Sequence, residues 1–236
     1  MLPFYFHEKY NPFFFVKIMQ KMKEDKSNTN DPTLSVDLSE ATQAVKENRF
    51  EDALMLFAII LKDHPNNIDA LYLASVSSRY LKKFDDSQKY IENLLLNAPD
   101  MGRAYQELGH INRDMGNDEK AIINYRQACE LNPALLASWN MLYQYFVKHK
   151  NQPAADHAQQ QIKKLESLPP ALLYIDQILN EGRLGLAERQ CRAFLQKNPT
   201  HTHAMSLLSE IANRLGYFDD AEFLLEKAVE FRPKDG

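Results

Sequence analysis

The sequence predicts an all-α fold built from about six helix pairs that follow one another along its 236 residues. Three prolines stand 34 residues apart: Pro65, Pro99 and Pro133. Three small residues keep the same step: Ala53, Ser87 and Ala121. No segment alternates apolar and polar residues between hairpin turns, which argues against a β-sheet. Repetition at this period indicates helical units that each pack against their neighbours.

Residues 1–33 differ from the rest of the chain, because aromatic residues are followed by charged and polar ones. Lys17 interrupts the apolar run and no small-residue cleavage site follows, so a signal peptide is disfavoured. Two interpretations stay open. The segment is a helix that docks on a membrane surface or a partner. Alternatively it is a poorly ordered leader, or a start placed upstream of Met19 or Met22.

The first two predicted repeats are residues 34–67 and 68–101. In the first repeat the first helix is weakly marked and the second is clear. In the first repeat, Ala53, Phe57 and Ile60 form an apolar stripe at helical spacing. The stripe of the second repeat has the same form. It consists of Ser87, Ile91 and Leu94.

The third repeat, residues 102–135, is the most regular copy. It predicts helices over about 103–115 and 119–131, separated by a tight turn at Gly116. Gly109 faces the partner helix and has no side chain, which allows Tyr125 to fill the space between the helices. Pro133 ends the second helix.

These positions resemble a tetratricopeptide (TPR) repeat, whose period is about 34 residues. The matching residues are Leu108, Gly109, Ala121, Tyr125, Ala128 and Pro133, with Tyr105 where Trp is commonest. The resemblance implies a right-handed superhelical solenoid of about six repeats. It also implies that the first helices line a concave groove.

The fourth repeat is irregular, and it predicts a boundary within the array. Trp139 and Leu142 mark its first helix, but Gln159 stands where an aromatic residue is expected. Pro169 and Pro170 forbid a continuous helix beyond this point. The sequence therefore predicts repeats one to four over 34–167 and repeats five and six over 168–236.

The segment from Leu179 to Pro233 carries a second resemblance, to the TPR arrays fused to bacterial sulfotransferase domains. No strand and phosphate-gripping loop for a sulfate donor accompanies it. No capping helix follows the sixth repeat either. We therefore expect this end of the array to pair with another subunit or to continue into a further domain.

Several kinds of chemistry are disfavoured. The sequence has no Gly-rich phosphate loop and no catalytic serine motif, so no enzymatic activity and no cofactor are expected. His201 and His203 form the only close histidine pair, and without a cysteine nearby we expect a loop pair rather than a metal site. Cys129 and Cys191 predict buried thiols and a cytoplasmic location.

Composition sets further limits. The net charge of -4 argues against nucleic acid as a partner. No apolar run reaches the roughly 18–20 residues that span a bilayer, so no transmembrane segment is expected.

The predicted groove is the remaining candidate site. Side chains one turn apart on the first helices of repeats two to four should face it. They are Tyr72, Arg79, Arg103, Gln106, His110, Arg113, Asn140 and Gln144. One aromatic ring, three arginines and several amides suit an extended or acidic peptide. The Lys and Asn clamp of chaperone-binding TPR domains is missing, so chaperone binding is not expected.

The sequence thus predicts a protein- or peptide-binding scaffold or adaptor without catalysis of its own. The alternative is the non-catalytic TPR portion, truncated or stand-alone, of a bacterial sulfotransferase system.

Overall fold

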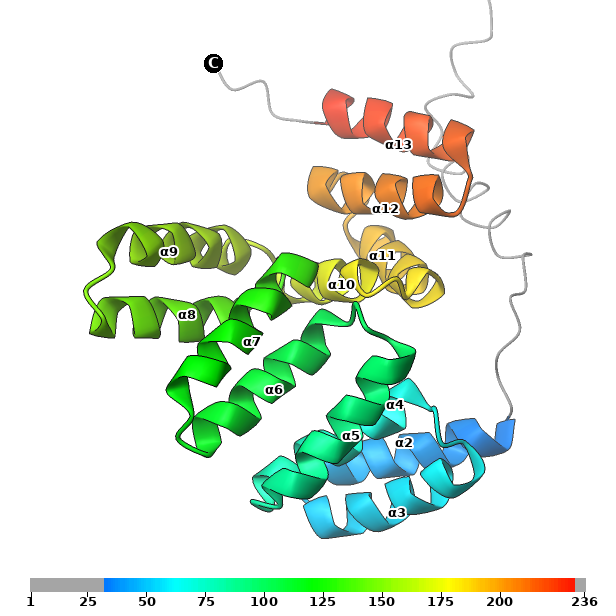
Figure 1. Cartoon of the computed structure of the whole chain (residues 1–236). Helices are drawn as coiled ribbons and strands as arrows, with labels where there is room; N and C mark the ends of the chain where they lie inside the picture. The colour runs from blue at the N-terminus through cyan, green and yellow to red at the C-terminus, as the bar shows by residue number, and fades with distance from the viewer. Residues whose placement is uncertain (1–31, 232–236) are drawn as a thin grey trace, which may run out of the picture. The chain divides into compact units, whose positions relative to one another are not determined.

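The computed structural model describes residues 32–231, and every regular element within that range is an α-helix (Figure 1). The predicted leader lies almost entirely outside the described residues. The all-α prediction is confirmed for the part of the chain described. The helices are α2 (Pro32–Lys46), α3 (Phe50–Asp63), α4 (Ile68–Tyr80), α5 (Phe84–Asn97), α6 (Gly102–Asp114), α7 (Asp118–Leu131), α8 (Leu136–Lys148), α9 (Gln152–Glu166), α10 (Pro170–Asn180), α11 (Leu184–Lys197), α12 (Thr202–Arg214) and α13 (Phe218–Glu230).

Contacts divide these helices into two compact units. The first unit is residues 32–183, with α2 to α10, and the second is residues 184–231, with α11 to α13. The sequence predicted a division at 167/168, beside the two prolines, whereas the boundary between the units follows α10. The division of the repeats into the segments 34–167 and 168–236 stays a prediction.

Within the first unit, each helix from α2 to α8 packs against the next one along the chain, so that the series of contacts runs from α2·α3 to α8·α9. Helix α4 also contacts α2 and α6, so the first helices of successive pairs lie side by side. The second unit repeats the pattern, because α12 packs against α11 and α13. This is the consecutive pairing that the 34-residue period predicts.

The turn inside each helix pair places one residue in the left-handed backbone region. At Gly116 φ is 79°, and the N–H of Asn117 donates to the carbonyl of Asn112 at 2.8 Å, which closes the end of α6. Lys82 occupies the same place in the second repeat with φ of 58°, at some cost in strain. The turn geometry therefore belongs to the repeat and does not depend on glycine being present.

The crossing of α6 and α7 has the predicted large-against-small packing. A Cβ atom on Gly109 would lie 2.5 Å from Cε1 of Tyr125, so the ring occupies the space that a side chain would need. Tyr125 is 1% exposed, and Ala121 and Ala128 are buried on either side of it. Tyr125 belongs to an apolar cluster that includes Leu142 of the next pair.

At the crossing of α4 and α5, Ser75 and Ser87 stand where the third repeat has Gly109 and Ala121, and hydrogen bonds compensate for the buried hydroxyls. Ser75 Oγ donates to the carbonyl of Ser87 at 2.9 Å, and Ser87 Oγ donates to the carbonyl of Ser75 at 2.8 Å. In the second unit, Ser209 Oγ donates to the carbonyl of Ala221 at 2.8 Å. These small polar residues satisfy both the packing and the hydrogen-bonding requirement of a buried crossing.

Candidate peptide-binding groove

All eight predicted groove residues belong to the first unit. Tyr72 and Arg79 lie on α4, Asn140 and Gln144 lie on α8, and the other four lie on α6. Two contacts join α6 directly to α8. Ser138 Oγ donates to Gln106 Oε1 at 3.0 Å, and Arg113 Nη1 lies 3.4 Å from the sulfur of Met141. The first helices of the third and fourth pairs are therefore neighbours, as a continuous groove requires.

Arg79 joins α4 to α6 through two carboxylates. Its Nε and Nη2 donate to the two oxygens of Glu107 at 2.6 and 3.4 Å, and its Nη1 donates to Asp114 at 3.2 Å. The side chains of Arg79 and Glu107 are 10% and 2% exposed. Burial raises the pKa of the Glu107 carboxyl, and the hydrogen bond from Arg79 opposes that shift. Little of the positive charge of Arg79 is left for a ligand.

Arg103 likewise forms an ion pair with a carboxylate of the same chain. Its Nε and Nη2 donate to the two carboxylate oxygens of Glu181, which follows α10. The Glu181 side chain is 2% exposed, and burial raises the pKa of its carboxyl. The guanidinium also lies 5.1 Å from the centre of the Tyr72 ring, within the range of a cation–π contact. Arg103 therefore fastens the end of α10 to α6.

Two further contacts extend this attachment along the segment 177–183. Asn132 Nδ2 donates to the carbonyl of Gln177, and Gln177 Nε2 donates to the carbonyl of Ala134, both at 2.9 Å. Arg183 donates to the two carboxylate oxygens of Asp69 at 3.0 Å each. Since these partners lie at the starts of α8 and α4, the segment crosses the N-terminal ends of α8, α6 and α4 in turn.

His110 is a neutral, partly buried member of the set. Its Nδ1 lies 2.7 Å from the hydroxyl of Tyr125, in hydrogen-bond contact. Burial, followed by the charges of Arg79 and Arg113, lowers the pKa of His110 to about 4. The imidazole therefore serves the packing of α6 against α7 at neutral pH.

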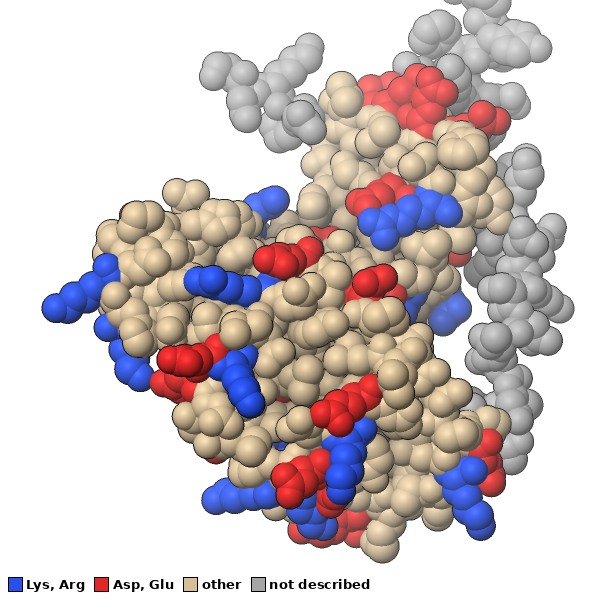
Figure 2. Space-filling model, viewed as in Figure 1, with Lys and Arg blue, Asp and Glu red and all other residues tan. Residues whose placement is uncertain are grey.

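The exposed members of the set are concentrated at the C-terminal half of α6 and on α8. The side chain of Arg113 is 41% exposed and pairs with its neighbour Asp114 at 2.7 Å. Gln144 is exposed, and Asn140 is half-buried with its Nδ2 donating to the carbonyl of Leu136 at 3.0 Å. On the face drawn in Figure 2, basic and acidic side chains lie close together rather than forming one basic area.

The acidic partners in this network were not predicted from the sequence. Asp69, Glu107 and Glu181 lie at very different distances along the chain from the arginines they bind. One signal was present in the sequence. Glu107 comes directly after the predicted groove residue Gln106, and successive residues of a helix point in different directions, so Glu107 faces the neighbouring repeat instead of the groove. The position of Glu181 depends on where α10 crosses, for which the repeat pattern holds no signal.

The residues singled out for other chemistry have structural roles. His201 caps α12, because its Nδ1 accepts a hydrogen bond from the N–H of Ala204 at 3.3 Å. Cys129 and Cys191 are free and buried, as predicted. Among the described residues, no group of three or more His, Cys, Asp or Glu side chains is arranged to hold a metal. None of the described helices has the length and apolar character needed to cross a membrane.

A family profile described as "Tetratricopeptide repeat" matches residues 102–135 and 202–235. Both segments are tetratricopeptide repeats. The first coincides with the predicted third repeat, and the second contains α12 and α13. A comparison with curated protein sequences gives no match.

Comparison with solved structures finds several similar proteins. The structure of pilF from Pseudomonas aeruginosa is 16% identical, covers 87% of this chain and 94% of its own, and has a TM-score of 0.52. MamA is 18% identical, covers 86% and 93%, and has a TM-score of 0.41. YrrB, described as a TPR protein with an unusual peptide-binding site, is 18% identical, covers 93% of both chains and has a TM-score of 0.40. At 16% identity the likeness to pilF concerns the fold, which is that of a helical TPR solenoid.

Two predictions are not tested by these comparisons. The relation of Leu179 to Pro233 with sulfotransferase-fused TPR arrays stays a prediction. The cytoplasmic location expected from the two cysteines stays one as well.

Proposed function

We propose that this TPR protein is a scaffold that binds extended peptide segments on the surface formed by α6 and α8 and catalyses no reaction on them. The observation that carries the proposal is the exposure of Arg113 and Gln144, with the half-buried Asn140 beside Gln144, on two first helices that contact each other directly. TPR arrays are interaction folds in which function resides in such surfaces.

Arg113, Asn140 and Gln144 together suit a peptide ligand. The amide groups of Asn140 and Gln144 each offer donors and an acceptor, which match the N–H and C=O groups of an extended chain. Arg113 adds a cation that can pair with an acidic side chain or carboxylate of the ligand. Its pairing with Asp114 is exposed and adjacent in sequence, so we expect a ligand to displace it at little cost.

Arg79 and Arg103 have a different role in this proposal. Both are held by carboxylates of the chain, and they fix α4, α6 and α10 relative to one another. We therefore assign them as positioning residues. A variant that reverses all three arginines would disturb the fold and the binding surface together, so a sharper variant leaves Arg79 and Arg103 intact.

The test uses random twelve-residue peptides displayed on phage, selected on the full-length protein. Selected peptides are then measured against Arg113→Glu/Gln144→Ala. The matched control is Lys120→Glu/Gln160→Ala, which makes the same charge change on exposed positions of the second helices α7 and α9. We expect about tenfold or greater loss of affinity for the first variant, the equivalent of one charge-assisted contact, and none for the control. Equal binding by both variants would exclude this surface.

A further inference from the structure

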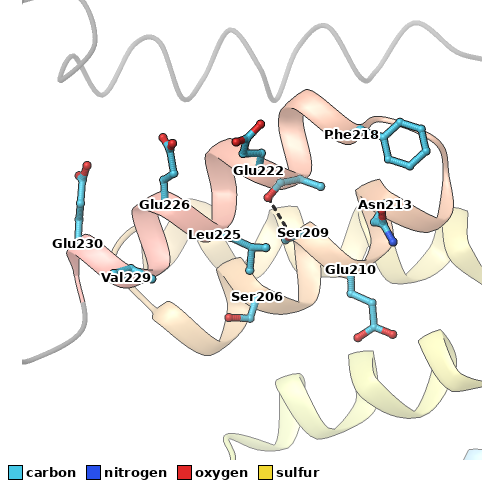
Figure 3. Close-up of a pocket in the computed structure, with 11 residues that line it drawn as sticks. Ser206, Ser209, Glu210, Asn213, Phe218, Glu222, Leu225, Glu226, Val229 and Glu230 are labelled. Atoms are coloured by element: carbon cyan, nitrogen blue, oxygen red, sulfur yellow. Dashed lines mark hydrogen bonds between the residues drawn. The ribbon is translucent and has the colours of Figure 1, made fainter.

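The last helix pair has an exposed hollow of about 970 Å³ between α12 and α13. Figure 3 shows Leu225 and Val229 on α13 above Ser206 of α12, with Phe218 at the far end. Phe218, Leu225 and Val229 are 66%, 49% and 67% exposed. Large apolar side chains with this exposure, gathered in one hollow, are characteristic of an interaction site.

Comparison with the other repeats shows what kind of element fits there. Leu225 stands four residues after Ala221, as Tyr125 stands four after Ala121. Tyr125 is buried because the next first helix, α8, packs over it through Leu142 and Phe146. No described helix packs in this way on α13. The shape and the exposed position therefore fit an amphipathic helix laid along the groove.

The acidic side chains of α13 indicate which kind of amphipathic helix can bind in the hollow. Glu222 and Glu226 lie one turn apart along the edge of the hollow (Figure 3), and neither carboxylate forms an ion pair with another described residue. Glu230 continues the line and pairs with Lys227 at 2.6 Å. A second copy of α13 would bring carboxylates against carboxylates, which disfavours pairing of two copies through this face. The helix that fits this hollow has one apolar face, and the residues along the border of that face are basic.

The chain contains such a segment outside the described residues. Residues 13–23, FFFVKIMQKMK, have no acidic side chain. At helical spacing, Phe15, Ile18 and Met22 fall on one face, while Lys17 and Lys21 stand one turn apart. That lysine spacing matches the spacing of Glu222 and Glu226 on α13.

We propose that residues 13–23 of the same chain dock as an amphipathic helix on α12 and α13, covering Leu225 and Val229 and pairing their lysines with Glu222 and Glu226. The interaction is independent of the peptide-binding surface proposed for α6 and α8. It assigns to the leader a definite partner within the protein.

Proximity is tested by disulfide formation in the full-length chain. Ile18→Cys/Val229→Cys is oxidised gently at low protein concentration. Ile18→Cys/Ile59→Cys serves as the control, because Ile59 is an apolar residue on α3 of similar exposure, 58% against 67% for Val229. We expect an intramolecular disulfide in the first variant and none in the control. A crosslink between two molecules, or equal crosslinking of both variants, overturns the proposal.

Charge exchange tests the pairing itself. Hydrogen exchange over residues 218–231 is measured in the full-length protein, in Lys17→Glu/Lys21→Glu, in Glu222→Lys/Glu226→Lys and in the combined variant. Each double variant should exchange up to about tenfold faster in this segment, and the combination should restore protection. Identical exchange in all four proteins overturns the proposal. So does a natively expressed protein whose N-terminus begins at Met19 or Met22.

Discussion

Arg103 donates two hydrogen bonds to the carboxylate of Glu181, 78 residues further along the chain. The glutamate side chain is 2% exposed, and the arginine side chain is 20% exposed. A groove arginine is thereby neutralised by the helix that crosses the starts of the first helices. The charge that the sequence offers to a partner is largely used within the fold.

Arg103→Met should destabilise the protein by about 3–5 kcal/mol, because it leaves the buried Glu181 carboxylate without a partner. Arg103→Met/Glu181→Leu should be less destabilised than the sum of the two single variants. Urea unfolding of all four proteins measures the coupling. Arg49→Met, which breaks an exposed pair with Glu47, should change the stability only slightly. Additive single effects would contradict a coupled buried pair.

His110 should make the protein less stable in mild acid. Its pKa in the fold is about 4, below the value of about 6.5 in an unfolded chain, so the unfolded chain binds the proton more readily. The neutral His110 therefore contributes about 3 kcal/mol to the free energy of unfolding above pH 6.5. This contribution is lost as the pH falls from 6.5 towards 4. His110→Gln should flatten this part of the stability profile in urea titrations at pH 4 to 7. An unchanged profile would show that His110 is accessible to protons.

Gly109→Ala should destabilise the protein by about 1–3 kcal/mol, because the new methyl group meets the Tyr125 ring at 2.5 Å. Gly185→Ala is the control, since the nearest atom to its Cβ, on Arg189, is 4.0 Å away. That helical substitution should be neutral or stabilise by up to about 1 kcal/mol. Thermal unfolding followed by circular dichroism compares the two. Equal melting temperatures would argue against the close approach of α6 and α7.

Asn132→Ala should loosen α10, because Asn132 is buried and its side chain holds the carbonyl of Gln177. Hydrogen exchange should quicken over residues 172–181 without a comparable change in α2 and α3. Asn124→Ala removes only an exposed hydrogen bond to the carbonyl of Lys120 within α7, so it should leave α10 unaffected. Faster exchange in both variants would indicate a general loss of stability.

Both cysteines should be unreactive in the native protein. Burial raises the pKa of the thiols of Cys129 and Cys191 to about 12, so little thiolate forms at pH 8. A thiol reagent such as Ellman's should react slowly with the native chain and rapidly with both thiols in guanidinium. A Ser167→Cys variant, with its thiol exposed at the end of α9, should add one rapidly reacting group. Rapid reaction of the wild type would contradict the buried positions.

The repeat pattern predicted the fold well, because it depends on local rules. The spacing of Ala121, Tyr125 and Pro133 reflects helix geometry and packing between neighbouring helices, both of which recur at each repeat. The turn at Gly116 and the burial of Tyr125 beside Gly109 followed from these rules alone. The small position at Ser87 was predicted, but its partner Ser75 and the hydrogen bonds between them were not.

The candidate groove was predicted less completely. Helical phase placed Arg79 and Arg103 on the first helices correctly, but it could not show that Glu107 and Glu181 bind them. Such pairs depend on how α10 crosses the first unit, which is a long-range property of the fold. A list of residues on one helix face therefore overestimates the charge that a groove presents.

The distance along the chain between Arg103 and Glu181 has a consequence for synthesis. At about 5–20 residues per second, the ribosome needs roughly 4 to 16 seconds after making Arg103 before it reaches Glu181. During that interval the early helices can stack while the guanidinium still faces water. The buried attachment of α6 to the end of α10 therefore forms only after Glu181 has been made, and until then Arg103 lacks its carboxylate partner.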